Sequence, residues 1–269
     1  MEDGWEHYKA AVRLYKLKRY EEALNEYDEA IRFNPTDADF HNSKGNTLDE
    51  LGRYEEALNE YDEAIRFDPT DADLHGNKAS TLYKLKRYEE ALNEYDEAIR
   101  FDPTDADFHN GKGDTLDELG RYKKALDEYD EAIRFNPTDA DFHNNKGMTL
   151  KELGRYEEAL DEYDEAIRFN PTDADFHNFK GNALYDLKRY EEALNEYDEA
   201  IRFDPRNAVY HGNKAHTFYI LKRYEEAVDE YDKAIQFDPR NADLHNNKSI
   251  VLQDLKRYKE ALDKYDKAI

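Results

Sequence analysis

The stretch ADFHNSKGNTLDELGRYEEALNEYDEAIRFDPTD, residues 38–71, decides the fold because close copies of it fill nearly the whole chain. The chain has seven prolines, and each follows the previous one by 34 residues: Pro35, Pro69, Pro103, Pro137, Pro171, Pro205 and Pro239. A period of this length is typical of stacked helical units rather than of one globular core. The chain therefore divides into eight units, at 4–37, 38–71, 72–105, 106–139, 140–173, 174–207, 208–241 and a partial 242–269.

Each unit carries two helical patterns. Residues 38–51 and 54–67 both place apolar or small side chains three and four positions apart, as one face of a helix requires. Gly52 interrupts the first pattern and Pro69 ends the second, while Thr70 or Asp71 can accept a hydrogen bond from the first free amides of the next helix. The sequence therefore predicts an all-α fold built from helix pairs.

These spacings resemble the tetratricopeptide repeat. The resemblance rests on a set of small, large and turn-forming residues at that family's positions: Gly45, Leu48, Tyr54, Ala57, Tyr61, Ala64 and Pro69. It implies a right-handed superhelical α-solenoid over residues 1–269, with the first helix of each pair lining a concave groove, and a non-enzymatic role in binding proteins. His41 and Lys44 depart from the family's apolar pattern. We expect Lys44 to lay its stem on the helix pair and keep its ammonium in water.

The charge balance limits the possible partners. The chain has 39 Lys plus Arg against 64 Asp plus Glu, a formal net charge of −25. Such a surface repels nucleic acid and favours a basic or neutral protein partner, although most of the charge also serves solubility. The opening residues do not form a basic leader followed by an apolar stretch, and no later segment has the length and apolarity of a membrane span. We therefore expect a soluble, cytoplasmic protein.

No pattern for catalysis or metal binding is found. The chain has no cysteine, and it lacks a Gly-rich phosphate loop, a nucleophile elbow and a zinc motif. We therefore expect no enzymatic activity, no metal and no cofactor. Eight of the nine histidines recur once per unit, which separates neighbouring imidazoles by about 8–10 Å or more, too far to share a metal ion. If these imidazoles are half-buried and neutral, acidification should destabilise the fold by charging them.

The units vary mainly on one face of the first helix. Their second helices are nearly identical, whereas one first-helix column differs in almost every unit: Val12, Asn46, Ser80, Asp114, Met148, Asn182, His216 and Ile250. A uniform scaffold with a variable face is what a recognition surface requires. Drift of solvent-facing residues is the alternative explanation.

Asparagines and aromatic residues mark the same face. Every unit from the second to the eighth has an asparagine there, and carboxamides can hold the backbone of an extended peptide. Aromatic side chains that project from this face can serve as anchors. Solvated polar residues kept by duplication are the alternative. We predict a peptide-binding groove made of Asn42, Asn46, Asn77, Tyr83, Asn110, Asn144, Asn145, Met148, Asn178, Phe179, Asn182, Tyr185, Asn213, Tyr219, Asn246 and Asn247.

Two other functions remain open from the sequence. The last unit stops at Ile269, within its second helix, so an open apolar face can associate end to end with another copy. The near-identical units also fit a designed or excised repeat array without a native partner. A peptide-binding module is the interpretation that the variable face favours.

Overall fold

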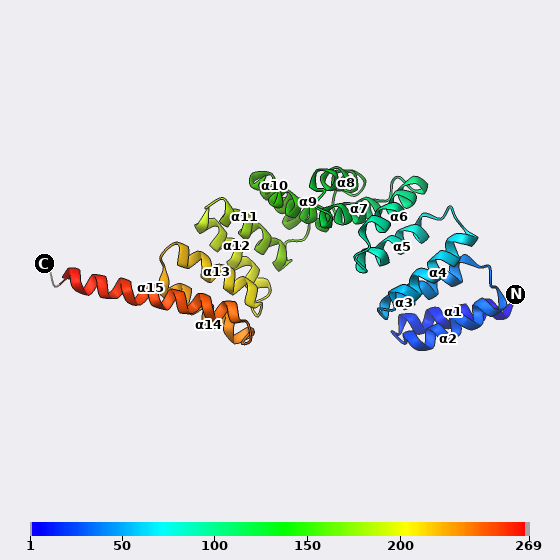
Figure 1. The fold of residues 1–269 in the computed structure, drawn as a ribbon, viewed down its shortest axis with the longest axis horizontal. Helices are drawn as coiled ribbons and strands as arrows, with labels where there is room; N and C mark the ends of the chain where they lie inside the picture. The colour runs from blue at the N-terminus through cyan, green and yellow to red at the C-terminus, as the bar shows by residue number, and fades with distance from the viewer. Residues whose placement is uncertain (1, 267–269) are drawn as a thin grey trace. The chain divides into compact units, whose positions relative to one another are not determined.

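The computed structural model describes residues 2–266 and has fifteen α-helices and no strand in that range (Figure 1). The all-α prediction is therefore confirmed. The helices are α1 (Glu2–Lys16), α2 (Tyr20–Phe33), α3 (Ala38–Glu50), α4 (Tyr54–Phe67), α5 (Ala72–Lys84), α6 (Tyr88–Phe101), α7 (Ala106–Glu118), α8 (Tyr122–Phe135), α9 (Ala140–Glu152), α10 (Tyr156–Phe169), α11 (Ala174–Asp186), α12 (Tyr190–Phe203), α13 (Ala208–Ile220), α14 (Tyr224–Phe237) and α15 (Ala242–Asp266).

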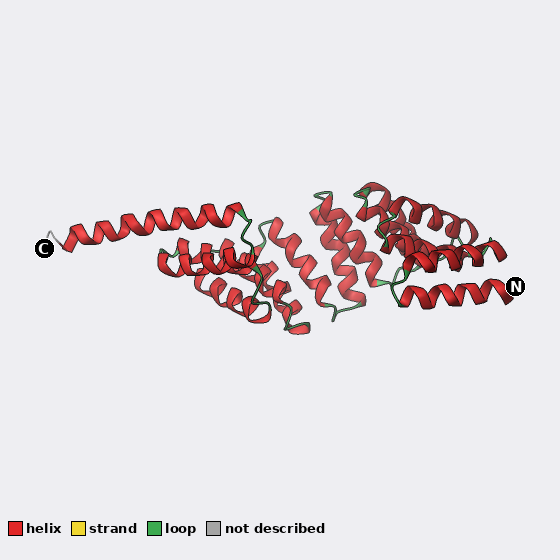
Figure 2. Ribbon diagram, turned by 90° about the horizontal axis from the view of Figure 1, so that it is seen from below, coloured by secondary structure: helices red, strands yellow, loops and turns green. Residues whose placement is uncertain are grey.

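The helices form two compact units, one up to residue 137 and the other from residue 138 onward. Within each unit the helices pack in chain order: α3 packs against α4 and α4 against α5, and the same scheme holds for α11, α12 and α13. First helices of successive repeats also contact one another: α3 contacts α5, and α11 contacts α13. Figure 2 shows the short loops that join the helices. Each unit is thus a tandem array of helix pairs.

Residues with positive φ end the first helix of most pairs. Gly52 has a φ of 72°, and Lys86 takes the same role with a φ of 59°. Glycine adopts this left-handed conformation without steric strain, whereas a lysine there costs about 1–2 kcal/mol. Between pairs, Asp71 Oδ1 accepts a hydrogen bond from the backbone N–H of Asp73 at 2.9 Å. This contact caps α5, as the sequence predicts.

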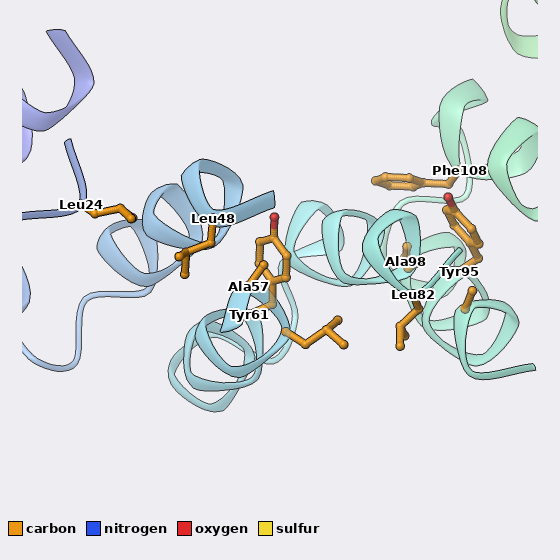
Figure 3. Close-up of a cluster of buried hydrophobic side chains, with 11 residues drawn as sticks. Leu24, Leu48, Ala57, Tyr61, Leu82, Tyr95, Ala98 and Phe108 are labelled. Atoms are coloured by element: carbon orange, nitrogen blue, oxygen red, sulfur yellow. The ribbon is translucent and has the colours of Figure 1, made fainter. Parts of the chain in front are cut away.

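Tyrosines of the second helices fill the centre of each pair. Tyr61 is 1% exposed and Ala57 is fully buried, and both belong to the apolar cluster drawn in Figure 3. A Cβ atom at Gly45 would lie 2.6 Å from the ring of Tyr61. Glycine at this position therefore lets α3 approach α4 closely, as dense core packing requires.

The eighth repeat departs from the predicted helix pair. Residues Ala242–Asp266 form one continuous helix, although the tetrapeptide LKRY at 255–258 also occurs at 85–88, where Lys86 makes the turn. The predicted break is wrong, and Ile269 lies outside the described residues.

A buried charge network joins the two helices at the positions that depart from the family pattern. His41 Nδ1 lies 2.7 Å from Glu60 Oε2, and Lys44 Nζ lies 2.6 Å from Glu60 Oε1. Lys44 Nζ also lies 2.8 Å from Asp28 Oδ1 of the preceding repeat. Two carboxylates thus hold the Lys44 ammonium, while the lysine side chain is 20% exposed. Similar His–Glu pairs occur at His75–Glu94, His109–Glu128, His143–Glu162, His177–Glu196 and His211–Glu230.

This network reverses the pH dependence expected from the histidines. The hydrogen bond to Glu60 raises the pKa of His41 despite the opposing effect of burial, and Glu128 raises the pKa of His109 in the same way. A group with a raised folded-state pKa stabilises the fold fully below its unfolded pKa, about 6.5, and this stabilisation is lost as pH rises through the folded pKa. Acidification into this range therefore strengthens these contacts.

Replacing His41 and His109 with glutamine tests this direction. We expect the double variant to lose the part of the stability that declines as pH rises above about 6.5 in the unsubstituted protein, because glutamine does not titrate. Thermal melts of both proteins across that range give the comparison. If the melting temperature of the unsubstituted protein instead exceeds that of the variant by more as pH rises, the histidines act as neutral groups.

Candidate functional site

The predicted peptide-binding residues lie along one face of the first helices. The first-helix face, as we call it, comprises the positions of Asn144, Asn145 and Met148 in α9 and their equivalents in the other repeats. Residues three and four positions apart in a helix are neighbours on its surface, so Met148 lies beside both asparagines. Because first helices of successive repeats touch within each unit, these positions form strips that cross several repeats.

In the first unit, polar groups of this face bond to one another. Asn77 Nδ2 on α5 donates to Asn42 Oδ1 on α3 at 3.1 Å. The hydroxyl of Tyr61, buried in the second helix, donates to Asn46 Oδ1 at 2.8 Å. The predicted asparagines thus connect adjacent repeats and connect the face to the core. Part of their hydrogen-bonding capacity is already used within the protein.

In the fourth repeat, Asp114 occupies the helix position that Asn46 has in the second repeat and Asn182 in the sixth. Its Oδ1 accepts from the Tyr129 hydroxyl at 2.8 Å, and its Oδ2 accepts from Asn110 Nδ2 at 3.3 Å. Burial raises the pKa of Asp114 to about 6, an effect that the hydrogen bond from Tyr129 only partly opposes. The charge on this part of the face therefore changes close to neutral pH.

In the second unit, a carboxamide network joins α11 and α13. Asn213 Nδ2 lies 2.9 Å from Asn178 Oδ1 and 3.2 Å from Asn182 Oδ1. Asn182 Oδ1 also accepts from the Tyr197 hydroxyl at 2.9 Å. Asn178 is buried. The structure thus brings three of the predicted residues into direct contact.

The fifth repeat presents a different surface. Asn144 is buried, Asn145 is half-buried and Met148 is 42% exposed. Asn144 Nδ2 lies 3.6 Å from the Met148 sulfur, which is a weak acceptor. The face therefore has a flexible thioether at this point, where the sixth repeat has the carboxamide of Asn182.

The predicted aromatic anchors are half-buried and pack against other aromatic rings. Phe179 on α11 has its ring centroid 6.4 Å from that of Tyr163 in the preceding repeat. The tyrosines each contact the first residue of the following second helix, at centroid distances of 5.5 Å for Tyr83–Tyr88, 5.3 Å for Tyr185–Tyr190 and 6.0 Å for Tyr219–Tyr224. Aromatic side chains held in this way lose little conformational entropy when they contact a ligand.

A cavity of about 360 Å³ opens on the first-helix face between α13 and α15. Asn213 and Asn247 line it, whereas Asn246 is exposed outside its lining. Val209 and Gly212 also line it and are absent from the predicted set. Both were detectable as departures from the repeat pattern, because Val209 stands where most repeats have aspartate and Gly212 where most have asparagine.

A second cavity, of about 380 Å³, lies in the first unit among α4, α5 and α6. Its lining is charged, and its charges pair with one another: Lys78 Nζ lies 2.5 Å from Glu94 Oε1, and Arg87 Nη2 lies 2.6 Å from Glu90 Oε2. Charges that are matched in this way favour packing of the repeats over ligand binding. This cavity is therefore the weaker candidate.

Among the side chains that the structure describes, in residues 4–259, no three histidine, aspartate or glutamate side chains gather closely enough to hold a metal ion. None of the helices in this range combines the length and the apolarity that crossing a bilayer needs.

Comparison with protein families identifies the repeat. A model described as "Tetratricopeptide repeat" matches residues 77–140 and 144–208. A second model, described as "TPR repeat", matches residues 11–51, 45–86 and 215–255. No curated protein sequence matches the chain.

Three solved structures illustrate the similarity of the fold. A tetratricopeptide repeat protein from Parabacteroides merdae is 16% identical with a TM-score of 0.72, and the match covers 94% of this chain and 100% of that one. Pseudomonas aeruginosa pilF is 20% identical with a TM-score of 0.68, over 79% and 96% of the two chains. YrrB, "a TPR protein with an unusual peptide-binding site", is 26% identical with a TM-score of 0.58, over 70% and 97%. Because the family models match most of this chain and its helix pairs pack in tandem, the chain belongs to the tetratricopeptide repeat family.

Proposed function

We propose that this chain binds an extended protein or peptide segment along its first-helix face. The observation that carries the proposal is the cavity between α13 and α15, which combines apolar Val209 and Leu244 with the carboxamides of Asn213 and Asn247. Ligand sites typically pair apolar walls with a few polar groups that fix the orientation of the ligand. The role is recognition, without a catalytic step.

The charges near this cavity favour a basic or neutral ligand. Asp238 and Asp243 belong to its lining, and the whole chain has a net charge of −25. Lysine or arginine residues beside the anchoring segment would be attracted, which raises the association rate at low salt. Acidic peptides and nucleic acids would be repelled.

A structural relative supports a peptide as the ligand. YrrB, which shares 26% of its residues with this chain over nearly its full length, is described as having a peptide-binding site. The same helix-pair scaffold therefore accommodates a peptide in at least one relative. The variable residues of the first-helix face would then set which peptide this chain prefers.

Selection from a phage-displayed library of random dodecapeptides tests the proposal. We expect Phe179→Ala combined with Tyr219→Ala to weaken the selected peptides about tenfold or more, because both variants remove aromatic walls of the face. The control is Glu165→Gln with Glu199→Gln, two exposed second-helix carboxylates that pair only with Arg168 and Arg202. Circular dichroism should show that both double variants remain folded.

The two variants separate binding on the first-helix face from binding elsewhere. Titration calorimetry of the selected peptides should show a change below about twofold for the second-helix control, since exposed ion pairs contribute little. A larger loss in the control than in the aromatic variant would place the ligand on the second helices and overturn the proposal.

A further inference from the structure

Two polar atoms of the fifth repeat are buried without a hydrogen-bond partner. They are Asn144 Oδ1 on α9 and the Tyr163 hydroxyl on α10, and no other side chain in the described range has such an atom. Asn144 is 7% exposed and Tyr163 is fully buried. Native proteins seldom leave buried polar atoms without partners, because the loss of hydration is then uncompensated. These two atoms therefore mark a place where a ligand group can complete the hydrogen bonding.

Met148 accounts for the missing partner of Tyr163. In the sixth repeat the equivalent hydroxyl, that of Tyr197, donates to Asn182 Oδ1 at 2.9 Å. The position of Asn182 is occupied by Met148 in the fifth repeat. A thioether accepts hydrogen bonds weakly, so the Tyr163 hydroxyl retains a donor that is satisfied at this position in the second, fourth and sixth repeats.

Phe179 accounts for the missing partner of Asn144. In the next pair of repeats, Asn178 Oδ1 accepts from Asn213 Nδ2 at 2.9 Å. The position equivalent to Asn213 is occupied by Phe179, one repeat after Asn144. A phenyl ring cannot donate a hydrogen bond, so Asn144 Oδ1 retains an acceptor. Two independent substitutions thus leave one donor and one acceptor in the same repeat.

A single small group can contact both side chains. In the fourth repeat the carboxylate of Asp114 accepts from the two equivalent side chains at once, from the Tyr129 hydroxyl through Oδ1 and from Asn110 Nδ2 through Oδ2. One planar group with two polar atoms therefore spans the two helix positions. In the fifth repeat Nδ2 of the asparagine already contacts the Met148 sulfur and Oδ1 is the atom without a partner, so the group must accept from Tyr163 and donate to Asn144 Oδ1.

We propose that the fifth repeat is a subsite for a carboxamide side chain, that of an asparagine or glutamine in a bound peptide. This inference rests on the proposed function. A carboxamide supplies a carbonyl oxygen for the Tyr163 hydroxyl and an N–H for Asn144 Oδ1. A carboxylate lacks the donor and an ammonium lacks the acceptor, so each would leave one of the two buried atoms without a partner. Phe179 provides an apolar wall for the methylenes of the ligand side chain.

Met148 controls access to this subsite. Both polar atoms are buried, while Met148 is exposed and contacts Asn144 Nδ2 through its sulfur. A methionine side chain is unbranched and repacks easily. Rotation of Met148 away from Asn144 would open the subsite and leave the thioether free to contact the ligand.

Parallel library selections with the unsubstituted protein and with Met148→Asn test the inference. The random dodecapeptides selected by the unsubstituted protein should share an asparagine or glutamine at one fixed position. Met148→Asn restores the acceptor of the sixth repeat, so peptides should still be selected but without this shared residue. A glutamine-to-leucine change in a selected peptide should weaken binding about tenfold to the unsubstituted protein and less than about twofold to Met148→Asn.

A second variant and a direct probe complete the test. Tyr163→Phe removes the donor while keeping the ring, and it should also abolish the preference for glutamine over leucine. The chain has two methionines, Met1 and Met148, so ¹³C-methyl methionine labelling reports on Met148 with one assignable signal. Glutamine-containing peptides should shift that signal more than their leucine counterparts.

The possible outcomes distinguish this inference from the proposed function. Peptides that bind the first-helix face with no preferred carboxamide, or that keep the preference in Met148→Asn and Tyr163→Phe, would overturn the subsite alone. A library that yields no binder to the unsubstituted protein would overturn peptide binding as well as the subsite.

Discussion

Replacing Glu230 with glutamine is expected to lower the free energy of unfolding by about 3 kcal/mol. Glu230 is 6% exposed and has three hydrogen-bond partners: His211 at 2.7 Å, Lys233 at 2.8 Å and Lys214 at 3.2 Å. Glutamine keeps the shape but removes the anion that holds these groups. Lys214 retains its ion pair with Asp198, at 2.6 Å, so the loss should lie at the lower end of the range for broken buried pairs. Urea unfolding followed by circular dichroism gives the measurement.

The pH dependence of the same carboxylate provides an independent check. Burial alone would raise the pKa of Glu230, but the hydrogen bonds from His211 and Lys233 and the charge of Lys214 outweigh it and hold the pKa at about 2. A depressed folded-state pKa means that the stabilisation is present above the unfolded pKa of about 4.3 and is lost as pH falls toward 2. Glu230→Gln should therefore lose part of the acid sensitivity between these two values.

Asp229 is the matched control for this prediction. It precedes Glu230 on α14 but is exposed. Asp229→Asn makes the same chemical change and should alter stability by less than about 0.5 kcal/mol, as exposed substitutions usually do. Equal losses in the two variants would mean that the effect comes from net charge and not from the buried network.

The helices and turns were predictable because their causes are local. Gly52 and Asp71 act within a few residues of their own positions, and the apolar spacing of 54–67 directly reflects the helical period. The break predicted within 255–258 is wrong, although the same four residues form a turn at 85–88, where Lys86 has a positive φ. Identical local sequence thus gives two different backbones.

The charge network and the groove were harder to predict because they depend on contacts between distant positions. His41 and Glu60 are 19 residues apart, and nothing in a spacing of that length shows that the carboxylate reverses the effect of burial on the imidazole pKa. The asparagines of the first-helix face were recognisable by composition. Their bonds across repeats, such as Asn77 to Asn42, required the stacking of two first helices.

The unusual chemistry of the fifth repeat was visible in the sequence only in part. Met148 stands out in a column that varies strongly, and Phe179 replaces an asparagine that recurs in other repeats. From the sequence alone, Met148 and Phe179 are two separate residues of the predicted groove. Only the structure shows that both substitutions affect buried atoms in one place, because Tyr163 lies beneath them on the second helix.

Truncating Tyr197 to alanine is expected to destabilise the protein by about 3–5 kcal/mol, because the loss of a buried aromatic ring leaves a cavity that packed helices cannot fill. Tyr197 is 1% exposed. Its ring also limits the approach of α11, since a Cβ atom at Gly181 would lie 2.6 Å from it. Chemical denaturation of the variant gives the measurement. A loss below about 1 kcal/mol would mean that the neighbouring helices collapse into the space.

Removing only the hydroxyl separates the role of the ring from that of the hydrogen bond. Tyr197→Phe should cost about 1 kcal/mol, because it breaks the bond to Asn182 and leaves that carbonyl with one donor fewer. Tyr163→Phe should instead raise stability by about 1 kcal/mol, since its buried hydroxyl has no partner to lose. The two substitutions remove the same atom from equivalent positions of adjacent repeats, so opposite signs can arise only from what faces each hydroxyl. Equal losses at both positions would show that the Tyr163 hydroxyl is satisfied in the free protein, and the carboxamide subsite would then lose its physical basis.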